Sequence, residues 1–156
     1  MTALAGIHIF AGLRDEVLES LAQRCTEIRA EQGDMIVEEN GMGREIYLIA
    51  EGSVRIVSQL GLPSETVLAE LGAGDFFGEM SVIECSRRSA SGIATEPSVL
   101  YALSNTEIHA LFKRWPDQFS ILILNISRDL CRRLRAMNKL FAAGHGAHLL
   151  GCGPSV

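Results

Sequence analysis

Residues 74–94 read GDFFGEMSVIECSRRSASGIA and combine turn, helix and charge signals in one short segment. Gly74 and Asp75 predict a turn, after which two phenylalanines lead to Gly78. Glu79 to Glu84 predict a short helical piece, which is followed by two arginines and a run of small residues. A glycine directly before a helical turn lets a ligand approach the backbone, whose unsatisfied N–H groups favour an anion.

Two charged side chains of this segment suggest the kind of ligand. The guanidinium of Arg88 can engage two phosphate oxygens at once. The carboxylate of Glu79 would be repelled by a phosphate, but it can accept a hydrogen bond from a sugar hydroxyl. Together they predict a ligand that carries a ribose hydroxyl and a phosphate close together. The alternative is a structural ion pair at the rim of a barrel.

Outward from this segment, residues from Glu31 to Leu103 consist of short apolar stretches separated by glycine-containing turns. Many short strands at close, regular spacing predict a small barrel or sandwich rather than alternating βα units. The expected strands are Met35–Val37, Ile46–Ile49, Val54–Val57, Thr66–Glu70, Ile93–Ala94 and Val99–Leu103.

The two flanks of this β region predict helices. Apolar residues at helical spacing indicate a short amphipathic helix from Arg14 to Cys25. Ser104 and Asn105 can cap a helix over Thr106–Arg114. Pro116 suits the first turn of a long helix that we expect to reach about Ala143, roughly 40 Å.

The long helix carries an apolar stripe that approximates a coiled-coil seam. Its members are Ile123, Ile126, Leu130, Met137 and Leu140, with Arg133 interrupting one position and Leu134 and Phe141 widening the stripe. The stripe either packs against its own barrel or pairs with the same helix of a second subunit. We expect a homodimer, because a small barrel cannot cover so long an apolar face.

The 156-residue chain has 47% hydrophobic residues and a formal net charge of -5. This size favours one domain, placed at residues 1–143, with a flexible glycine-rich tail at residues 144–156. The negative charge provides no general attraction to nucleic acids. No apolar run approaches the roughly 20 residues needed to cross a bilayer, and no secretory signal is evident. With four scattered cysteines, the sequence indicates a reduced, cytoplasmic protein.

Catalysis and metal binding find little support in the sequence. None of the histidines lies beside a serine or cysteine in a nucleophile motif, and the β region contains no histidine for a cupin-type metal site. His145, His148 and Cys152 lack a fourth ligand and a rigid frame. We therefore expect no enzymatic activity, no metal and no required cofactor.

The order F-G-E-M-S, followed nine residues after the glutamate by R-S-A, resembles the phosphate-binding cassette of cyclic nucleotide-binding domains. The resemblance covers about residues 7–140. It includes Ile9-Phe10 with Gly12-Leu13, Gly33 to Ile36, the turn from Glu38 to Gly43, and Ile46–Ile49 followed by Gly52–Ile56.

This resemblance implies a mainly β fold with flanking helices (α+β). The expected fold is a double-stranded β-helix or jelly-roll-like β-roll with a short N-terminal helix and a long C-terminal helix. The implied ligand is cAMP or cGMP, with cAMP favoured, and the long helix would close over the purine. The candidate ligand-binding residues are Phe77, Gly78, Glu79, Met80, Ser81, Arg88, Ser89, Ala90, Arg132 and Arg133.

Within this set the resemblance assigns particular roles. Glu79 would hold the ribose 2′-hydroxyl, and Arg88 would hold the cyclic phosphate because it directly precedes Ser89 and Ala90. Gly78, Ser89 and Ala90 would make close backbone or hydroxyl contacts, while Arg132 or Arg133 would lie near the base. The expected role is a sensor or regulatory domain that couples ligand binding to movement of the C-terminal helix.

Other regulatory roles remain open at the level of sequence. Many relatives that resemble the bacterial catabolite activator carry a helix-turn-helix after the long helix, and the roughly 15 residues that follow it here are too few for one. We therefore expect no direct DNA binding by this chain. It is either a freestanding sensor, a regulatory fragment of a transcription factor, kinase or channel, or a nucleotide-independent β-roll that binds a partner.

Overall fold

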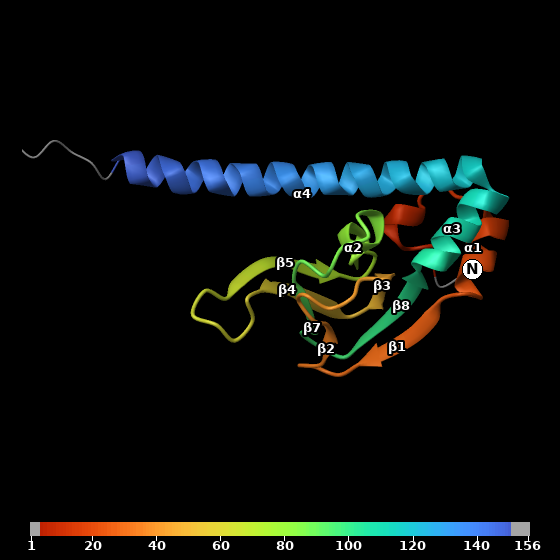
Figure 1. Cartoon of the computed structure of the whole chain (residues 1–156), viewed down its shortest axis with the longest axis horizontal. Coiled ribbons are helices and arrows are strands. Elements are labelled where there is room, and N and C mark those ends of the chain that lie inside the picture. The colour runs from red at the N-terminus through yellow and green to blue at the C-terminus, as the bar shows by residue number, and fades with distance from the viewer. Residues whose placement is uncertain (1–3, 151–156) are drawn as a thin grey trace, which may run out of the picture.

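The computed structural model describes the backbone of residues 4–150 and the side chains of residues 4–144. Two four-stranded antiparallel sheets form a roll, and helices gather at one end of it (Figure 1). The helices are η1 (His8–Phe10, a 3-10 helix), α1 (Asp15–Ala22), α2 (Glu79–Ile83), α3 (Asn105–Arg114) and α4 (Pro116–Leu150). The strands are β1 (Thr26–Ala30), β2 (Met35–Val37), β3 (Glu45–Glu51), β4 (Ser53–Ser58), β5 (Thr66–Gly72), β6 (Phe76–Phe77), β7 (Ser91–Ala94) and β8 (Ser98–Ser104).

Successive strands alternate between the two sheets except for β4 and β5, which pair with each other in one sheet. One sheet has the order β1-β8-β3-β6 and the other β2-β7-β4-β5. The longest registers join β3 to β8 and β4 to β5, and each contains one irregularity. The predicted mainly β roll with a short N-terminal and a long C-terminal helix is therefore confirmed.

The continuous apolar run of β3 reflects burial on both faces of its sheet. Ile46 and Leu48 face the helices, whereas Tyr47 and Ile49 face the interior of the roll. Alternate strand residues point to opposite faces, so a run without polar residues is expected where both faces are covered. The short strand β6 follows the same rule: Phe76 joins the helical core and Phe77 the interior of the roll. Two hydrophobic cores therefore meet at β3 and β6.

Strand β1 was missed by the sequence analysis, which placed the start of the β region at Glu31. Thr26–Ala30 pairs with β8 at the edge of its sheet, and only Ala30 is fully buried. Because an edge strand that is mostly exposed needs few apolar residues, it leaves little pattern in the sequence. The short strand β6 was not predicted either, whereas the six predicted strands all coincide with strands of the structure.

The helix caps agree with the sequence. The hydroxyl of Ser104 accepts a hydrogen bond from the Glu107 backbone N–H, which caps α3, and Pro116 begins α4. α4 continues to Leu150, beyond the expected end near Ala143. Residues 151–156 of the predicted tail, with Cys152 of the weighed metal site, lie outside the described residues.

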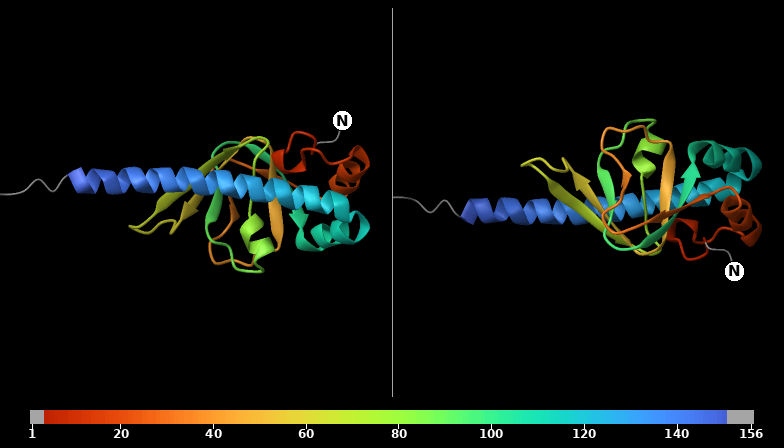
Figure 2. Two further views of the ribbon diagram at one scale, coloured as in Figure 1. Left: turned by 90° about the horizontal axis from the view of Figure 1, so that it is seen from above. Right: turned by 90° about the horizontal axis from the view of Figure 1, so that it is seen from below.

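α4 crosses the helical end of the roll and then extends well past it (Figures 1 and 2). Leu122 and Ile126 are fully buried in the helical core, and the side-chain amide of Asn125 donates to two carbonyl oxygens of the η1 region. The predicted seam was wrong at Ile126, which is buried in the helical core, and Leu130 also packs against that core. Within residues 4–150, no helix is both long and apolar enough to cross a membrane.

Candidate functional site

The candidate site begins at Gly78, between β6 and α2. Its φ of 84° lies in the left-handed region that favours glycine. A Cβ at this position would lie 2.5 Å from Nη1 of Arg88 and 3.0 Å from the carbonyl oxygen of Glu45. Any side chain here would therefore be strained and would displace the arginine. The glycine lets the two ends of the cassette come together.

Arg88 lies in the interior of the cassette, with 5% of its surface exposed. Its Nη1 donates to the carbonyl oxygen of Gly78 at 3.0 Å and to the hydroxyl of Ser81 at 2.9 Å. Nη2 lies 3.4 Å from a carboxylate oxygen of Glu45, and the guanidinium carbon is 5.3 Å from the centre of the Tyr47 ring. These contacts fix the arginine in one orientation before any ligand arrives.

The loop before β3 holds Arg88 from the other side. The Arg88 backbone N–H donates to the carbonyl oxygen of Gly41, and its carbonyl accepts from Asn40. A Cβ at Gly43 would overlap the Ser81 side chain and lie 3.3 Å from Nε of Arg88. The position of the guanidinium thus depends on two glycines, at positions 43 and 78, that let backbone approach it.

Glu79 is the first residue of α2 and is 3% exposed. Burial raises the pKa of this carboxyl above its ordinary value, while Arg133 opposes the rise. Asp129 adds to the rise, and Arg88 makes a smaller opposing contribution. A carboxylate in this setting has lost water that a hydrogen-bond donor from a ligand could replace.

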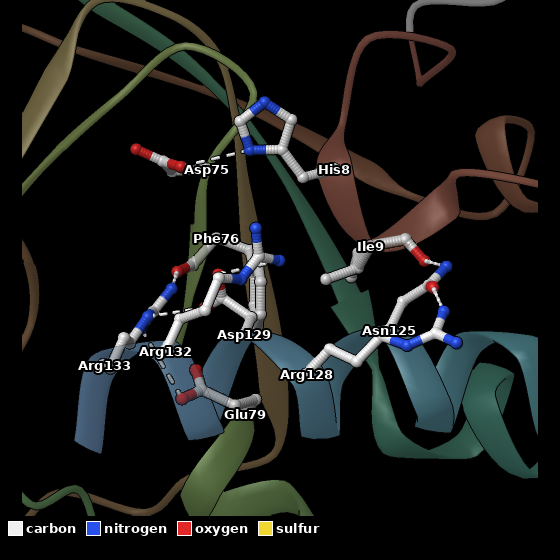
Figure 3. Close-up of polar contacts among 10 residues, drawn as sticks. All are labelled: His8, Ile9, Asp75, Phe76, Glu79, Asn125, Arg128, Asp129, Arg132 and Arg133. Carbon is white, nitrogen blue, oxygen red and sulfur yellow. Dashed lines mark hydrogen bonds and ion pairs between the residues drawn. The ribbon is translucent and has the colours of Figure 1, made fainter. Parts of the chain in front are cut away.

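Arg133 of α4 reaches across to the cassette (Figure 3). Its Nη2 donates to the carbonyl oxygen of Phe76 at 2.8 Å, and its Nη1 lies 3.7 Å from Oε1 of Glu79. Nε lies 2.6 Å from a carboxylate oxygen of Asp129, one turn earlier on the same helix. The guanidinium carbon also lies 4.8 Å from the centre of the Phe76 ring. One side chain therefore joins α4, β6 and the start of α2.

The remaining candidate residues have less uniform positions. Phe77 is buried and stacks on Tyr47 with ring centres 5.2 Å apart. Ala90 is buried, whereas Met80 and Ser89 are exposed. Arg132 is mostly exposed, and its Nη2 lies 3.7 Å from a carboxylate oxygen of Asp129. The structure thus brings Gly78, Glu79, Ser81 and Arg88 together, and it directs Arg133 rather than Arg132 toward them.

Three residues of the site were missed by the sequence analysis: Glu45, Tyr47 and Asp129. Glu45 and Tyr47 lie on β3, 43 and 41 positions before Arg88, so that only the sheet register reveals their contact with it. Asp129 could have been found, because a carboxylate four positions before an arginine on one helix is a recognised pairing.

Comparisons with known proteins match the chain to one family and to several relatives. The family described as cyclic nucleotide-binding domain matches residues 27–114. A cyclic AMP receptor protein of Thermus thermophilus is 35% identical over 133 residues, which are 85% of this chain and 59% of that protein. A cyclic nucleotide-gated channel alpha-4 of Mus musculus is 28% identical over 155 residues, or 96% of this chain and 26% of the channel.

A solved structure shows the same fold. The crystal structure of the Thermus thermophilus catabolite activator protein has a TM-score of 0.73 and 34% sequence identity to this chain. The match covers 86% of this chain and 62% of that one. The chain therefore spans less than two thirds of the length of these relatives.

Proposed function

Because the chain belongs to the cyclic nucleotide-binding domain family, we propose that it binds a cyclic nucleotide and acts as a regulatory sensor rather than a catalyst. We propose cAMP as the preferred ligand over cGMP, in keeping with the name of the cyclic AMP receptor protein to which the chain is 35% identical. The proposal retains the cytoplasmic location expected from the sequence.

The observation that carries the proposal is the burial of Glu79 and Arg88 within one cassette. A structural ion pair would join these two groups, yet Arg88 pairs with Glu45 and Glu79 with Arg133. The cassette therefore offers an oriented guanidinium and a separate buried carboxylate. An anion that also carries a hydroxyl group satisfies both, and a cyclic nucleotide has this combination in its phosphate and its ribose 2′-hydroxyl.

We propose that α4 responds to the ligand through Arg133. Its contacts with Glu79 and with the Phe76 carbonyl lie at the entrance to α2, where the ribose would bind. A ligand shifts the helix only to the extent that it binds the two arrangements with different affinity. A hydroxyl that donates to Glu79 changes the partner of Arg133, and this supplies such a difference.

We further propose that the chain forms a homodimer through α4. Leu134 and Met137 are each 58% exposed on α4. Leu140 continues this exposed stripe and is 75% exposed, whereas Leu130 packs against the helical core of its own chain. We expect Leu134→Asp to lower the mass found by sedimentation equilibrium from dimer to monomer. Met35→Asp, a similar change on the exposed side of β2, leaves the mass unchanged, and a monomeric wild type contradicts the proposal.

Calorimetric titration with cAMP and then cGMP tests the proposed function. We expect saturable binding, tighter for cAMP, and a loss of at least roughly 30-fold in affinity for Arg88→Ala. Arg55→Ala is the matched control, because Arg55 forms an exposed ion pair with Glu70 on the roll, away from the cassette. The control is expected to bind like the wild type.

The outcomes of this titration separate the alternatives. Tighter binding of cGMP overturns only the preference for cAMP. If the folded wild type gives no heat with either nucleotide, the sensor proposal fails, and the β-roll is better explained as a nucleotide-independent module that binds a partner.

A further inference from the structure

Glu45 is a carboxylate placed against the arginine that the proposed function assigns to the phosphate. It begins β3, and its Oε2 lies 3.4 Å from Nη2 of Arg88. Glu45 remains 38% exposed, whereas Arg88 is almost fully buried. An anion that approaches the guanidinium therefore also approaches a negative charge that solvent screens only in part.

The charges around the cassette do not sum to a positive site. Glu45, Glu79 and Asp129 contribute three carboxylates, and Arg88, Arg133 and Arg132, which pairs with Asp129, contribute three guanidinium groups. The ionised set thus carries no net charge. Most binding sites for highly charged phosphates collect several cations, so this arrangement suits an anion of low charge.

Arg88 is also partly engaged before a ligand binds. Nη1 donates to Gly78 and Ser81, and Nη2 faces Glu45. The nearby Arg87 does not add to the site, because its Nη1 donates to the carbonyl oxygen of Asn40 on the outside of the cassette. The phosphate must therefore bind to a guanidinium whose charge Glu45 already offsets.

We propose that Glu45 selects ligands by the charge of their phosphate, favouring a singly charged cyclic phosphodiester over a doubly charged phosphate monoester. This inference rests on the proposed function, since it concerns the same site. Hydrolysis of a cyclic nucleotide opens the diester ring and yields a monoester with a second ionisable oxygen, which is mostly ionised above about pH 7. Glu45 would thus weaken the binding of the hydrolysis product relative to the cyclic nucleotide.

The size of the effect follows from Coulomb's law. A phosphate on the far side of the guanidinium would lie roughly 6 Å from the Glu45 carboxylate, and the monoester carries about one more unit of charge. With an effective dielectric constant between about 80 and about 40, removal of Glu45 changes the relative affinity of the two ligands by roughly 3- to 10-fold. This change in relative affinity does not depend on how strongly Arg88 attracts each ligand, because Arg88 is present in both the wild type and the protein without Glu45.

The test compares cAMP and 5′-AMP on the wild type, Glu45→Gln and Glu70→Gln at about pH 8, where the monoester is doubly charged. Calorimetry measures cAMP directly, and 5′-AMP is measured by its competition with cAMP. We expect Glu45→Gln to strengthen 5′-AMP relative to cAMP by roughly 3- to 10-fold. Glu70→Gln removes an exposed carboxylate that pairs with Arg55, and it should leave the ratio of affinities unchanged.

Three results of this test would overturn the inference about Glu45. If Glu45→Gln changes both affinities by the same factor, Glu45 merely positions Arg88 and the inference is overturned. The inference is also overturned if Glu70→Gln shifts the ratio of the two affinities as much as Glu45→Gln does. It is overturned as well if 5′-AMP does not compete with cAMP for binding to either the wild type or Glu45→Gln. Failure of the proposed function is separate, because the wild type then binds neither cAMP nor cGMP, and the inference falls with it.

Discussion

Replacing Arg133 by alanine tests how α4 is held to the cassette. The substitution removes the hydrogen bond to the Phe76 carbonyl, the ion pairs with Glu79 and Asp129, and the contact with the Phe76 ring. It also leaves the buried Glu79 without its nearest cation. Arg132→Ala is the matched control, because this neighbour on α4 is 69% exposed and approaches only Asp129, at 3.7 Å.

The magnitude can be worked from these contacts. Removal of one partner from a fully buried ion pair costs about 3–5 kcal/mol, and a hydrogen bond to a charged group contributes about 1.5–3 kcal/mol. Because the Arg133 side chain is 31% exposed, water can replace part of what is lost. We therefore expect a loss of about 2 kcal/mol, which for a chain of this length lowers the unfolding midpoint by roughly 4–8 °C. Arg132→Ala should lower it by about 1 °C or less.

Thermal unfolding followed by circular dichroism measures both variants, and its pH dependence identifies the cause. The pKa of Glu79 is raised in the folded protein, so the folded state keeps this proton to higher pH than the unfolded chain does. The free energy of unfolding therefore falls as the pH rises from the pKa of Glu79 in the unfolded chain to its higher pKa in the folded protein. Loss of Arg133 raises that pKa further, so its cost should be largest near neutral pH and shrink in acid, where Glu79 is neutral. Equal midpoints for the two arginine variants would refute the reasoning.

Three further predictions concern the cassette and its attachment to α4. Glu79→Gln should raise the unfolding midpoint near pH 7.5 but not near pH 4, because it removes a buried charge, and calorimetry should show at least roughly tenfold weaker nucleotide binding. Gly78→Ala should weaken binding strongly because its Cβ meets Arg88, whereas Gly33→Ala, also at positive φ but with no atom within 4 Å of its Cβ, should cost only stability; equal binding by both contradicts the steric account. Asn125→Ala should lower the free energy of unfolding in urea by about 1–2 kcal/mol, because two carbonyls near η1 lose their donor; no change would mean that water replaces the amide.

The sequence predicts the roll because its turns and its cassette are local signals. Glycines mark the turns, and Gly78, Glu79 and Arg88 lie within eleven consecutive residues, so their proximity needs little knowledge of the fold. Glu45 has no such signal, because one carboxylate at the start of a strand has no periodicity, and only the pairing of β3 with β6 brings it to the cassette. Site residues that lie in one segment can therefore be predicted from the sequence. The opposite charges that other segments bring to the site cannot.

The sequence also does not predict how α4 is rotated about its own axis. The sequence places Arg132 and Arg133 side by side, and either could have faced the site. Successive helix residues differ in direction by about 100°, so the choice depends on which face the core holds. Leu122 and Ile126 are buried against the roll, and Arg133 lies on the same face two turns after Ile126. The packing of two apolar residues therefore decides which arginine reaches the cassette.

The two arginines of the site are linked to opposite faces of the short strand β6, Arg133 by direct contact and Arg88 through Tyr47 of β3. Arg133 lies against the ring of Phe76 on the helical side, and Arg88 lies against Tyr47, which stacks on Phe77 inside the roll. β6 is only two residues long and pairs with β3 at two positions, so few ladder bonds oppose its movement. The carbonyls on either side of Phe77 each accept from one of the arginines. An anion that competes with the Gly78 carbonyl for Arg88 therefore acts at the end of the strand that Arg133 joins to α4, and this gives the proposed coupling a short physical route through β6.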